Sequence, residues 1–411
     1  MKHFGIVMLG WLVSLSVVAE TITIGLNAPS TGRYKVQGIA QARGALLAID
    51  EINKSGGILG NKVVLARKNT ASDPKRAVKN VRNLVLREGA AMLLGGVSSS
   101  VAIAAGKEAK ALDRIYFGTL TYSNATTGAQ GHTHMFRETY NAWMGAKVLA
   151  KYLNKEYAGK KFFFITADYT WGWSTEDSLR QFTNTQDTEQ HPGVKTTFPK
   201  PRRSDFSNAL DEAKAAGAEV LVVVQFGDDM VRALKMIRSK NLDLPIVVPS
   251  LTLGMAQEAG AVLMDGVVGA VPWAWQVPYQ YGHGRGQKFV QDFLTTYDIY
   301  PSSSAASAYS IVYQYKDAVE RAKSFDTRKV IKALEGHRYS LLKDEQEWRS
   351  FDHQNIQSVY VVRGKPKNQV VKDRYRSDYF EILDKLDGAE AVRTYDEWLK
   401  ARQKVGKGEL K

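Results

Sequence analysis

The chain has 411 residues, of which 44% are hydrophobic and 24% charged, so it has the composition of an ordinary globular protein and a length that favours two domains. It contains no cysteine, which excludes disulfides, thiolate metal sites and cysteine nucleophiles. The formal net charge is +14, but the lysines and arginines are scattered without a basic stripe of interleaved aromatics, so nucleic acid is not an expected partner.

The first 19 residues differ from the rest of the chain. A weakly basic start is followed by an almost entirely apolar run over residues 4–18, and the small residues Val17, Val18 and Ala19 precede Glu20. The apolar run is short for a membrane span. The pattern predicts a cleaved secretory signal peptide over residues 1–19, so that the mature protein works in the periplasm.

Strands and helices then alternate. The β-branched run Thr21–Leu26 predicts a strand, and apolar residues at helical spacing predict a helix from about Lys35 to Ile52. Further strands are expected at 61–67, 91–94 and 114–118, with helices opening at Asp73-Pro74 and over 102–112. This order predicts an α/β fold with a parallel sheet covered by helices on both faces.

The same pattern restarts after a linker through Glu138–Asn141. We expect strands at 162–166, 194–199, 219–225, 245–249 and 267–273, and helices at 174–182, 206–216, 230–239, 289–296 and 303–322. Two such halves, joined by short connections, predict two lobes with a cleft between them, which is a common place for a small-molecule site.

A candidate floor for this site lies between Ala91 and Leu112. A buried strand is followed by the turn Gly95-Gly96 and by three consecutive hydroxyls, Ser98 to Ser100, where a helix begins. Any one of these serines could cap the helix, but three exceed what capping needs. A strand, a glycine turn and free hydroxyls beside a helix N-terminus favour binding of an anionic or polar small molecule.

Six segments occur in a characteristic order behind the predicted signal peptide: IGLNAPSTG at 24–32, ALLAIDEINKSGGILG at 45–60, LLGGVSSS at 93–100, MFRETYN at 135–141, SDFSNAL at 204–210 and FDHQNIQSVYVV at 351–362. Together they resemble the periplasmic solute-binding proteins of ABC importers, of the leucine-binding type that takes branched-chain amino acids and amides. The resemblance runs from Thr21 to about Gly364.

The resemblance implies a Venus-flytrap, or type I periplasmic binding, fold: two doubly wound parallel-sheet lobes joined by three crossover hinges. The hinges are expected near Glu138–Asn141, Val271–Trp273 and Phe351–Gln354. Lobe one would then hold 20–138 and 273–350, and lobe two 139–272 and 351–411, the latter ending in a charged tail with a helix around Ala389–Gln403.

The resemblance also implies a set of ligand-binding residues. In lobe one, hydroxyls and main-chain N–H groups would hold the polar end of the ligand; the matching positions are Gln37, Ser98, Ser99, Leu120, Thr121 and Tyr122. In lobe two, Trp171 stands where a tyrosine usually covers the ligand, and the other matching positions are Tyr169, Phe226, Gly227 and Thr252. Each aromatic residue could instead pack in a core, but all of them follow the ends of predicted strands, where packing residues are less expected.

One feature departs from the family pattern. Amino-acid binders of this family meet the ligand's ammonium with an acidic residue in lobe two, whereas the loop Val248–Leu253 has no carboxylate. Asp228 or Asp229 could substitute, but both also suit the first turn of a helix. Because a desolvated ammonium without a counter-charge costs several kcal/mol, a branched-chain amino acid, an amide and an aromatic acid all remain candidate ligands.

Other function classes are less favoured. The chain has no GxSxG, HExxH or P-loop motif, and the only close histidine pair, His132 and His134, would need further metal ligands. No catalytic residue, metal or cofactor is therefore expected. We expect a monomer that delivers a small molecule to an ABC permease and its ATPase. A binding protein that signals through a membrane receptor is the alternative, and an exported enzyme is the more distant one.

Overall fold

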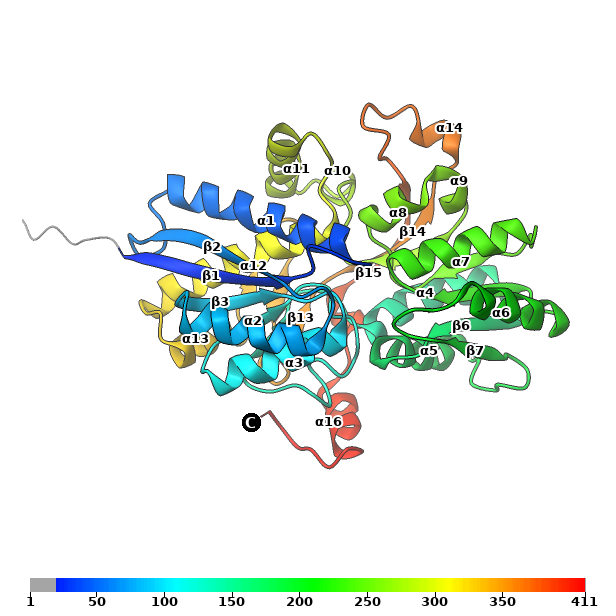
Figure 1. Ribbon diagram of the computed structural model, residues 1–411, viewed down its shortest axis with the longest axis horizontal. Coiled ribbons are helices and arrows are strands. Elements are labelled where there is room, and N and C mark those ends of the chain that lie inside the picture. The colour runs from blue at the N-terminus through cyan, green and yellow to red at the C-terminus, as the bar shows by residue number, and fades with distance from the viewer. Residues whose placement is uncertain (1–19, 411) are drawn as a thin grey trace, which may run out of the picture.

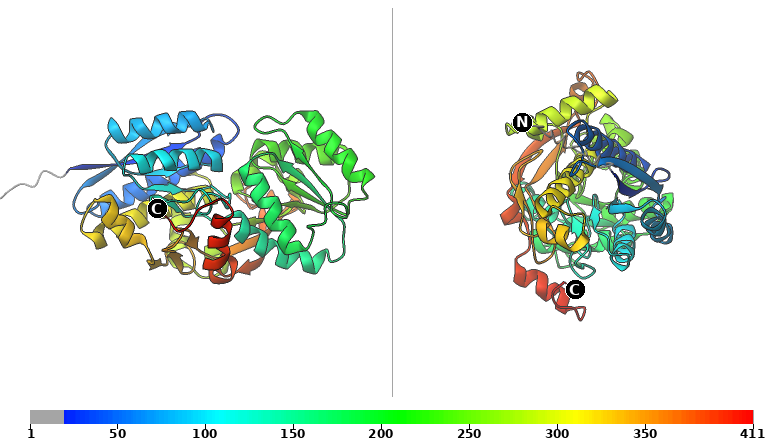
Figure 2. Two further views of the ribbon diagram at one scale, coloured as in Figure 1. Left: turned by 90° about the horizontal axis from the view of Figure 1, so that it is seen from below. Right: turned by 90° about the vertical axis from the view of Figure 1, so that its left-hand side faces the viewer.

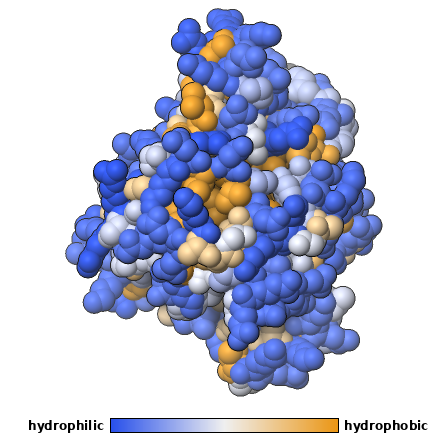
Figure 3. All heavy atoms as spheres, turned by 90° about the vertical axis from the view of Figure 1, so that its right-hand side faces the viewer, coloured by the Kyte–Doolittle hydropathy of each residue, from blue (hydrophilic) through white to orange (hydrophobic). Residues whose placement is uncertain are grey.

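The computed structural model describes residues 20–410, and the predicted signal peptide at 1–19 lies outside these described residues. Two α/β lobes lie side by side along the longest axis of the molecule (Figure 1). Seen from the lobe-two end, the surface is mainly hydrophilic, with hydrophobic patches near the centre of that face (Figure 3). Within residues 20–410, no helix is long and apolar enough to span a membrane.

Lobe one is built on a five-stranded parallel sheet in the order β2-β1-β3-β4-β5. Its strands are β1 (Thr21–Ala28), β2 (Lys62–Asn69), β3 (Ala90–Gly95), β4 (Tyr116–Gly118) and β5 (Met135–Arg137). Its first helices are α1 (Lys35–Lys54), α2 (Pro74–Leu86) and α3 (Ser99–Ala111). A later part of the chain adds α10 (Val277–Gln280), α11 (Gly284–Tyr297), α12 (Ser303–Ala322) and α13 (Thr327–Leu334), and a small antiparallel sheet of β11 (Arg338–Tyr339), β12 (Gln346–Trp348) and β13 (Asn355–Ile356).

Lobe two is built on a seven-stranded sheet in the order β15-β14-β10-β9-β8-β6-β7. Its parallel strands are β6 (Phe162–Ala167), β7 (Gly193–Thr196), β8 (Val220–Val224), β9 (Ile246–Val248) and β10 (Val268–Val271). At one edge, β14 (Val359–Gly364) pairs antiparallel with β10, and β15 (Phe380–Leu386) pairs antiparallel with β14. Its helices are α4 (Ala142–Glu156), α5 (Thr170–Thr183), α6 (Arg203–Ala215), α7 (Asp228–Ser239), α8 (Leu253–Ala259), α9 (Ala261–Met264), α14 (Lys367–Val370) and α15 (Gly388–Ala391).

Local sequence explains most of these elements. All five residues of β8 are buried, as expected of a strand covered by helices on both faces. Helix α2 begins at Pro74, and the side chain of Asp73 accepts a hydrogen bond from the Arg76 N–H, which satisfies one free donor of the first turn. The predicted α/β fold with two doubly wound, largely parallel sheets is therefore confirmed.

Several elements differ from expectation, among them α4, β15 and the tail helix. Helix α4 lies in a stretch where no helix was predicted, and the side chain of Asn141 caps it by accepting from the Met144 N–H. Strand β15 adds an edge to the lobe-two sheet in the tail. The tail helix expected over Ala389–Gln403 is split into α15 and α16 (Tyr395–Gln403), because Val392 has an extended backbone.

The chain passes between the two large sheets after β5, after β10 and after β13. The third passage comes later than the expected Phe351–Gln354, because Gln354 still pairs with Arg137 of β5 and donates from its side chain to the Thr139 carbonyl. It therefore follows Ile356. The assignment of whole residue ranges to the two lobes stays a prediction.

The C-terminal tail returns to lobe one after β15 has joined lobe two. Trp398 on α16 donates from Nε1 to the Thr127 carbonyl at 3.0 Å, and Arg402 donates to the carbonyls of Gly128 and Gly131 at 2.5 and 3.2 Å. Figure 2 shows this helix, in red, below the junction of the lobes. The tail thus ties both lobes together on one side of the molecule.

Candidate functional site

Loops at the carboxyl ends of strands from both sheets face one another across the boundary between the lobes. Lobe one contributes the segments after β1, β3 and β4, and lobe two those after β6, β8 and β9. In open α/β sheets, ligands bind outside the carboxyl ends of the strands. These facing loops therefore form the candidate site, and the residues predicted for it all lie on or beside them.

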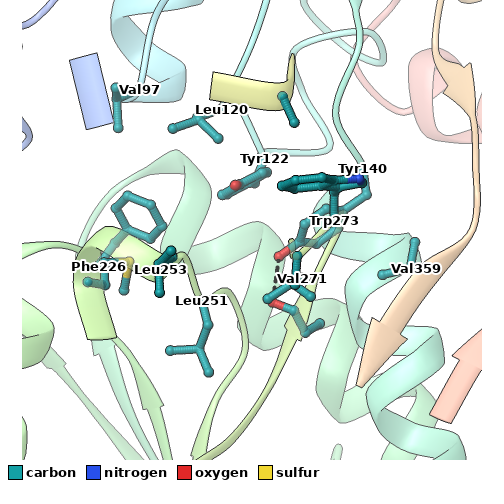
Figure 4. Packing of buried hydrophobic residues seen from close by; sticks show 14 of the residues in the cluster. Val97, Leu120, Tyr122, Tyr140, Phe226, Leu251, Leu253, Val271, Trp273 and Val359 are labelled. Atoms are coloured by element: carbon teal, nitrogen blue, oxygen red, sulfur yellow. Dashed lines mark hydrogen bonds between the residues drawn. The ribbon is translucent and has the colours of Figure 1, made fainter. Parts of the chain in front are cut away.

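An aromatic cluster fills the boundary. The ring of Phe226, from lobe two, has its centroid 5.7 Å from Tyr34 and 5.9 Å from Tyr122 of lobe one, and 5.8 Å from Trp171 of lobe two. Figure 4 shows Phe226 facing lobe-one residues, with Tyr122 lying against Tyr140 at 4.7 Å. All five side chains are buried. The two lobes are therefore closed on each other here.

Hydroxyl and amide groups also bridge the lobes. Ser123 Oγ lies 3.1 Å from Thr170 Oγ1 and 3.0 Å from Ser174 Oγ, and Asn124 donates to Ser178 Oγ at 3.0 Å. The predicted Ser99 supports this bridge from lobe one, because its hydroxyl accepts from the Ser123 N–H at 3.0 Å. Short polar contacts thus accompany the aromatic ones in the closed arrangement.

Three of the predicted ligand-binding side chains carry buried polar atoms that make no well-formed hydrogen bond among residues 20–410, although the Tyr122 hydroxyl lies near those of Thr139 and Ser303. These polar atoms are both amide atoms of Gln37, the Tyr122 hydroxyl and Trp171 Nε1. Burial raises the pKa of Tyr122 well above its usual value, so its hydroxyl stays protonated and can donate. Since buried polar groups in folded proteins are nearly always paired, these atoms are suited to binding a small molecule.

The other predicted residues make local contacts instead. Ser98 stands at the N-cap position of α3, but its hydroxyl lies 2.9 Å from Ser100 Oγ and makes no cap bond. Thr121 Oγ1 lies 2.6 Å from Thr126 Oγ1, and Thr252 caps α8 by accepting from the Met255 N–H at 3.2 Å.

Three further predicted residues pack without offering a free polar atom to the cleft. Leu120 is a buried core residue. The ring of Tyr169 stacks on Phe198 at 3.8 Å. Gly227 has a positive φ of 60°, and a Cβ there would lie 2.7 Å from the ring of Tyr34, so glycine permits the close approach of the lobes.

Tyr34 and Arg33 belong to the site but were not predicted from the sequence. The Arg33 guanidinium lies 2.7 Å from the Asp229 carboxylate across the lobes, at the mouth of the cleft. A pocket of about 740 Å³ opens there and is lined by both residues together with Lys200 and Glu258. Burial raises the pKa of Asp229 to about 6, although Arg33 opposes that shift. The only signal for Arg33 and Tyr34 in the sequence is their position in the loop after β1.

The histidine pair is engaged in local contacts. His132 Nδ1 accepts from the His134 N–H at 3.3 Å, and His134 Nε2 lies 2.9 Å from the Asp113 carboxylate. Over the part of the chain that the structure describes, no group of three or more His, Cys, Asp or Glu side chains is placed to hold a metal ion.

Comparisons with known proteins agree with this architecture. The sequence profile of the periplasmic binding protein family matches residues 21–369. The Leu/Ile/Val-binding protein BraC3 of Rhizobium johnstonii is 32% identical over 206 residues, which cover 50% of this chain and 54% of that protein. The leucine-, isoleucine-, valine-, threonine- and alanine-binding protein of Pseudomonas aeruginosa is 25% identical over 349 residues, which cover 82% of this chain and 88% of that one. The match thus spans about half of the first relative and most of the second.

Solved structures share the fold. A periplasmic binding protein from Burkholderia mallei superposes with a TM-score of 0.82 at 22% identity, covering 92% of this chain and 98% of that one. A solute-binding protein of an ABC transporter from R. palustris, in complex with benzoate, superposes with a TM-score of 0.75 at 18% identity, covering 90% and 97%. The chain belongs to the periplasmic binding protein family, whose members are ligand carriers rather than enzymes and work outside the cytoplasm.

Proposed function

We propose that this protein is the substrate-binding component of an ABC importer, which captures a small solute between its lobes and delivers it to a permease and its ATPase. The observation that carries this proposal is the closed boundary, where unpaired buried polar atoms of Gln37, Tyr122 and Trp171 lie among aromatic rings. We further propose that residues 1–19 act as a cleaved signal peptide, and that the protein works as a monomer without nucleic acid.

Binding and closure are coupled in this account. The ligand first meets one lobe of an open form, and the second lobe then closes about the hinge passages. A ligand shifts this equilibrium only as far as it binds the closed form better than the open one. The ion pair of Arg33 with Asp229 and the contacts of Ser123 with Thr170 exist only while the lobes are together, so they add to the closed form.

The cleft chemistry favours a ligand without an ammonium group. None of Tyr34, Gln37, Tyr122, Trp171 and Phe226 carries a carboxylate, and the acids that act on this cluster, Asp229 near Tyr34 and Glu138 near Tyr122, lie at its edge. The candidate acid Asp229 is paired with Arg33 at the mouth. The N–H of Trp171, the hydroxyl of Tyr122 and the amide of Gln37 can all donate to a carboxylate or carbonyl oxygen.

The aromatic rings suit an apolar or aromatic ligand body. We therefore propose an aromatic or branched carboxylate, or an amide, as the ligand class. The benzoate held by the R. palustris structure is a precedent for an aromatic carboxylate, whereas the P. aeruginosa relative is named for amino acids, which carry an ammonium.

A thermal-shift screen of the mature protein tests this proposal. Matched pairs separate the ammonium from the rest of the ligand: leucine against 4-methylpentanoate, phenylalanine against 3-phenylpropanoate, and benzoate against benzamide. A ligand at a hundred times its Kd adds about 2.7 kcal/mol of stability. We expect shifts with the members that lack an ammonium. Shifts with leucine and phenylalanine alone would contradict the ligand class, and no shift with any small solute would contradict the function.

The sensor alternative uses the same closure, so the ligand screen does not separate it from import. Genes for a permease and an ATPase beside this gene would favour import, whereas a neighbouring sensor-kinase gene would favour signalling.

A further inference from the structure

The second and third passages between the lobes are joined by one buried side chain. Lys343 lies in the lobe-one loop between β11 and β12 and is only 4% exposed. Its ammonium donates to the carbonyl of Pro272 at 2.7 Å, to Gln357 Oε1 at 2.6 Å and to the carbonyl of Ser358 at 2.9 Å. Pro272 follows β10, and Gln357 and Ser358 follow β13, so one ammonium holds both passages.

The first passage is joined to the same group. The amide nitrogen of Gln357 donates to the carbonyl of Glu138, which directly follows β5, and Gln354 donates to the carbonyl of Thr139 at 2.8 Å. Glu138 and Lys343 both line a cavity of about 10 Å³, a space no larger than one water molecule. Lys343, Gln357 and Glu138 therefore connect all three passages in one compact, buried network.

The neighbouring Asp344 extends this network into lobe two. Its carboxylate accepts from the Ser358 hydroxyl at 2.5 Å and lies 2.7 Å from the ammonium of Lys385. Lys385 belongs to β15, the edge strand of the lobe-two sheet, and also pairs with Asp387 at 2.9 Å. Strand β15 lies beyond residue 369, where the family match ends, so this part of the contact is built from sequence outside the matched region.

The network is costly to build. Removing an ammonium from water is unfavourable unless it is fully hydrogen-bonded, and a well-packed apolar residue often serves stability as well or better. Burial lowers the pKa of Lys343 to about 8, because the charged form is less stable away from water. Each of the three bonds from Lys343 ends on a residue of a passage rather than on a carboxylate. This arrangement fixes the passages relative to one another.

We propose that Lys343 and Asp344 form a hinge clamp, which holds the three passages as a single axis so that closure ends in one interlobe geometry. Neither residue belongs to the ligand-binding cluster, so both are positioning residues. The inference rests on the proposed function in one respect, because ligand binding is what the clamped closure serves. The hinge itself can be measured without a ligand.

The absence of cysteine makes that measurement direct. Lys75→Cys on α2 and Lys214→Cys on α6, both exposed, place a pair of fluorophores on opposite lobes of the mature protein. Single-molecule energy transfer then gives the distribution of interlobe distances. In this background, Lys343→Met removes the clamp, and Lys365→Met is the matched control, because Lys365 pairs with Asp378 at 2.6 Å beside the lobe-two strands β14 and β15.

We expect Lys343→Met to broaden the ligand-free distance distribution and to weaken binding of a ligand from the screen about tenfold, equivalent to about 1.4 kcal/mol. Lys365→Met should have the same distance distribution and the same ligand affinity as the parent protein. An unchanged distribution in folded Lys343→Met would overturn the clamp, whether or not a ligand has been found. If Lys343→Met does not fold, Asp344→Asn decides: a broadened distribution supports the clamp and an unchanged one overturns it.

Discussion

The guanidinium of Arg33 lies 2.7 Å from the carboxylate of Asp229, and this ion pair joins the two lobes at the mouth of the cleft. Arg33 comes from the loop after β1, and Asp229 stands in the first turn of α7. The side chain of Asp229 is only 4% exposed. An acid that the sequence offered as a partner for a ligand ammonium therefore serves the closed form instead.

Arg33→Ala tests this role. The variant leaves Asp229 without its interlobe partner, and closure then buries a carboxylate that has lost its counter-charge. We expect ligand affinity to fall about tenfold in isothermal titration, with little change in the thermal stability of the ligand-free protein. The matched control is Arg232→Ala, because Arg232 lies 3.7 Å from the same carboxylate but on the same helix. Equal effects of the two variants would contradict a role of the Arg33–Asp229 ion pair in holding the lobes closed.

Gly254→Ala tests the closed boundary by steric means. A Cβ on Gly254, in α8, would lie 2.7 Å from Val36 Cγ1 of lobe one, closer than packed atoms approach. Alanine favours the helix, so the ligand-free protein should lose no stability. Ligand affinity should fall at least about tenfold, because the clash arises only when the lobes meet. Gly284→Ala, where a Cβ meets no atom within 4 Å, is the control. Normal affinity in Gly254→Ala would mean that ligand binding does not require this boundary.

Trp171→Phe and Tyr122→Phe separate ligand binding from folding. Each change removes a buried donor while keeping an aromatic ring: Trp171 Nε1 has no protein partner among the described residues, and the Tyr122 hydroxyl has only the nearby hydroxyls of Thr139 and Ser303. The free energy of unfolding should change by less than about 1 kcal/mol, because no well-formed protein hydrogen bond is lost. Ligand affinity should fall about five- to thirtyfold, the usual cost of one or two hydrogen bonds.

Trp398→Phe is the matched control for this pair. Its Nε1 donates to the Thr127 carbonyl, so it should lose about 1 kcal/mol of stability and no affinity. If all three variants change the free energy of unfolding and the ligand affinity by the same amounts, the donors of Trp171 and Tyr122 have no special role in binding.

The pKa of Lys343 predicts a pH dependence of stability. Burial lowers this pKa to about 8, while Asp344 and Glu138 raise it and Lys385 lowers it further. A lysine in the unfolded chain keeps its proton to about pH 10.4, so between these values the folded protein binds fewer protons than the unfolded one. Its stability relative to Lys343→Met should therefore rise with pH from 8 towards 10, by about 1.4 kcal/mol per unit. Urea denaturation of both proteins at pH 7, 8, 9 and 10 measures this, and a constant difference would contradict it.

Much of the fold could be predicted because its signals are local. The apolar run of β8 and the small-residue helix α12 are continuous in sequence, and α12 was expected over the same residues, 303–322. Helix α4 was missed although Lys147, Lys151, Asn154 and Lys155 recur at helical spacing, because its first nine residues are almost all buried and include only one charged side chain. Strand β15, FEILDKL, is half polar because it forms an exposed edge.

The site could be predicted only in part. The family resemblance proposed Gln37, Tyr122, Trp171 and Phe226, and each lies in a segment that follows a predicted strand. Arg33 belongs to the site because it pairs with Asp229, which lies 196 residues away in the sequence. No local sequence pattern predicts this contact between the lobes. Thr121 and Thr252 match ligand-binding positions of the family, but their hydroxyls contact a neighbouring hydroxyl and a helix N–H, and a sequence does not distinguish these uses.

The most direct test of the proposed site is a crystal structure of the mature protein grown with the strongest ligand from the screen. The account predicts a ligand enclosed between the lobes, with a carboxylate or carbonyl oxygen within hydrogen-bonding distance of Trp171 Nε1, the Tyr122 hydroxyl or the Gln37 amide. A ligand bound outside this cluster, or one whose ammonium contacts Asp228 or Asp229, would contradict it.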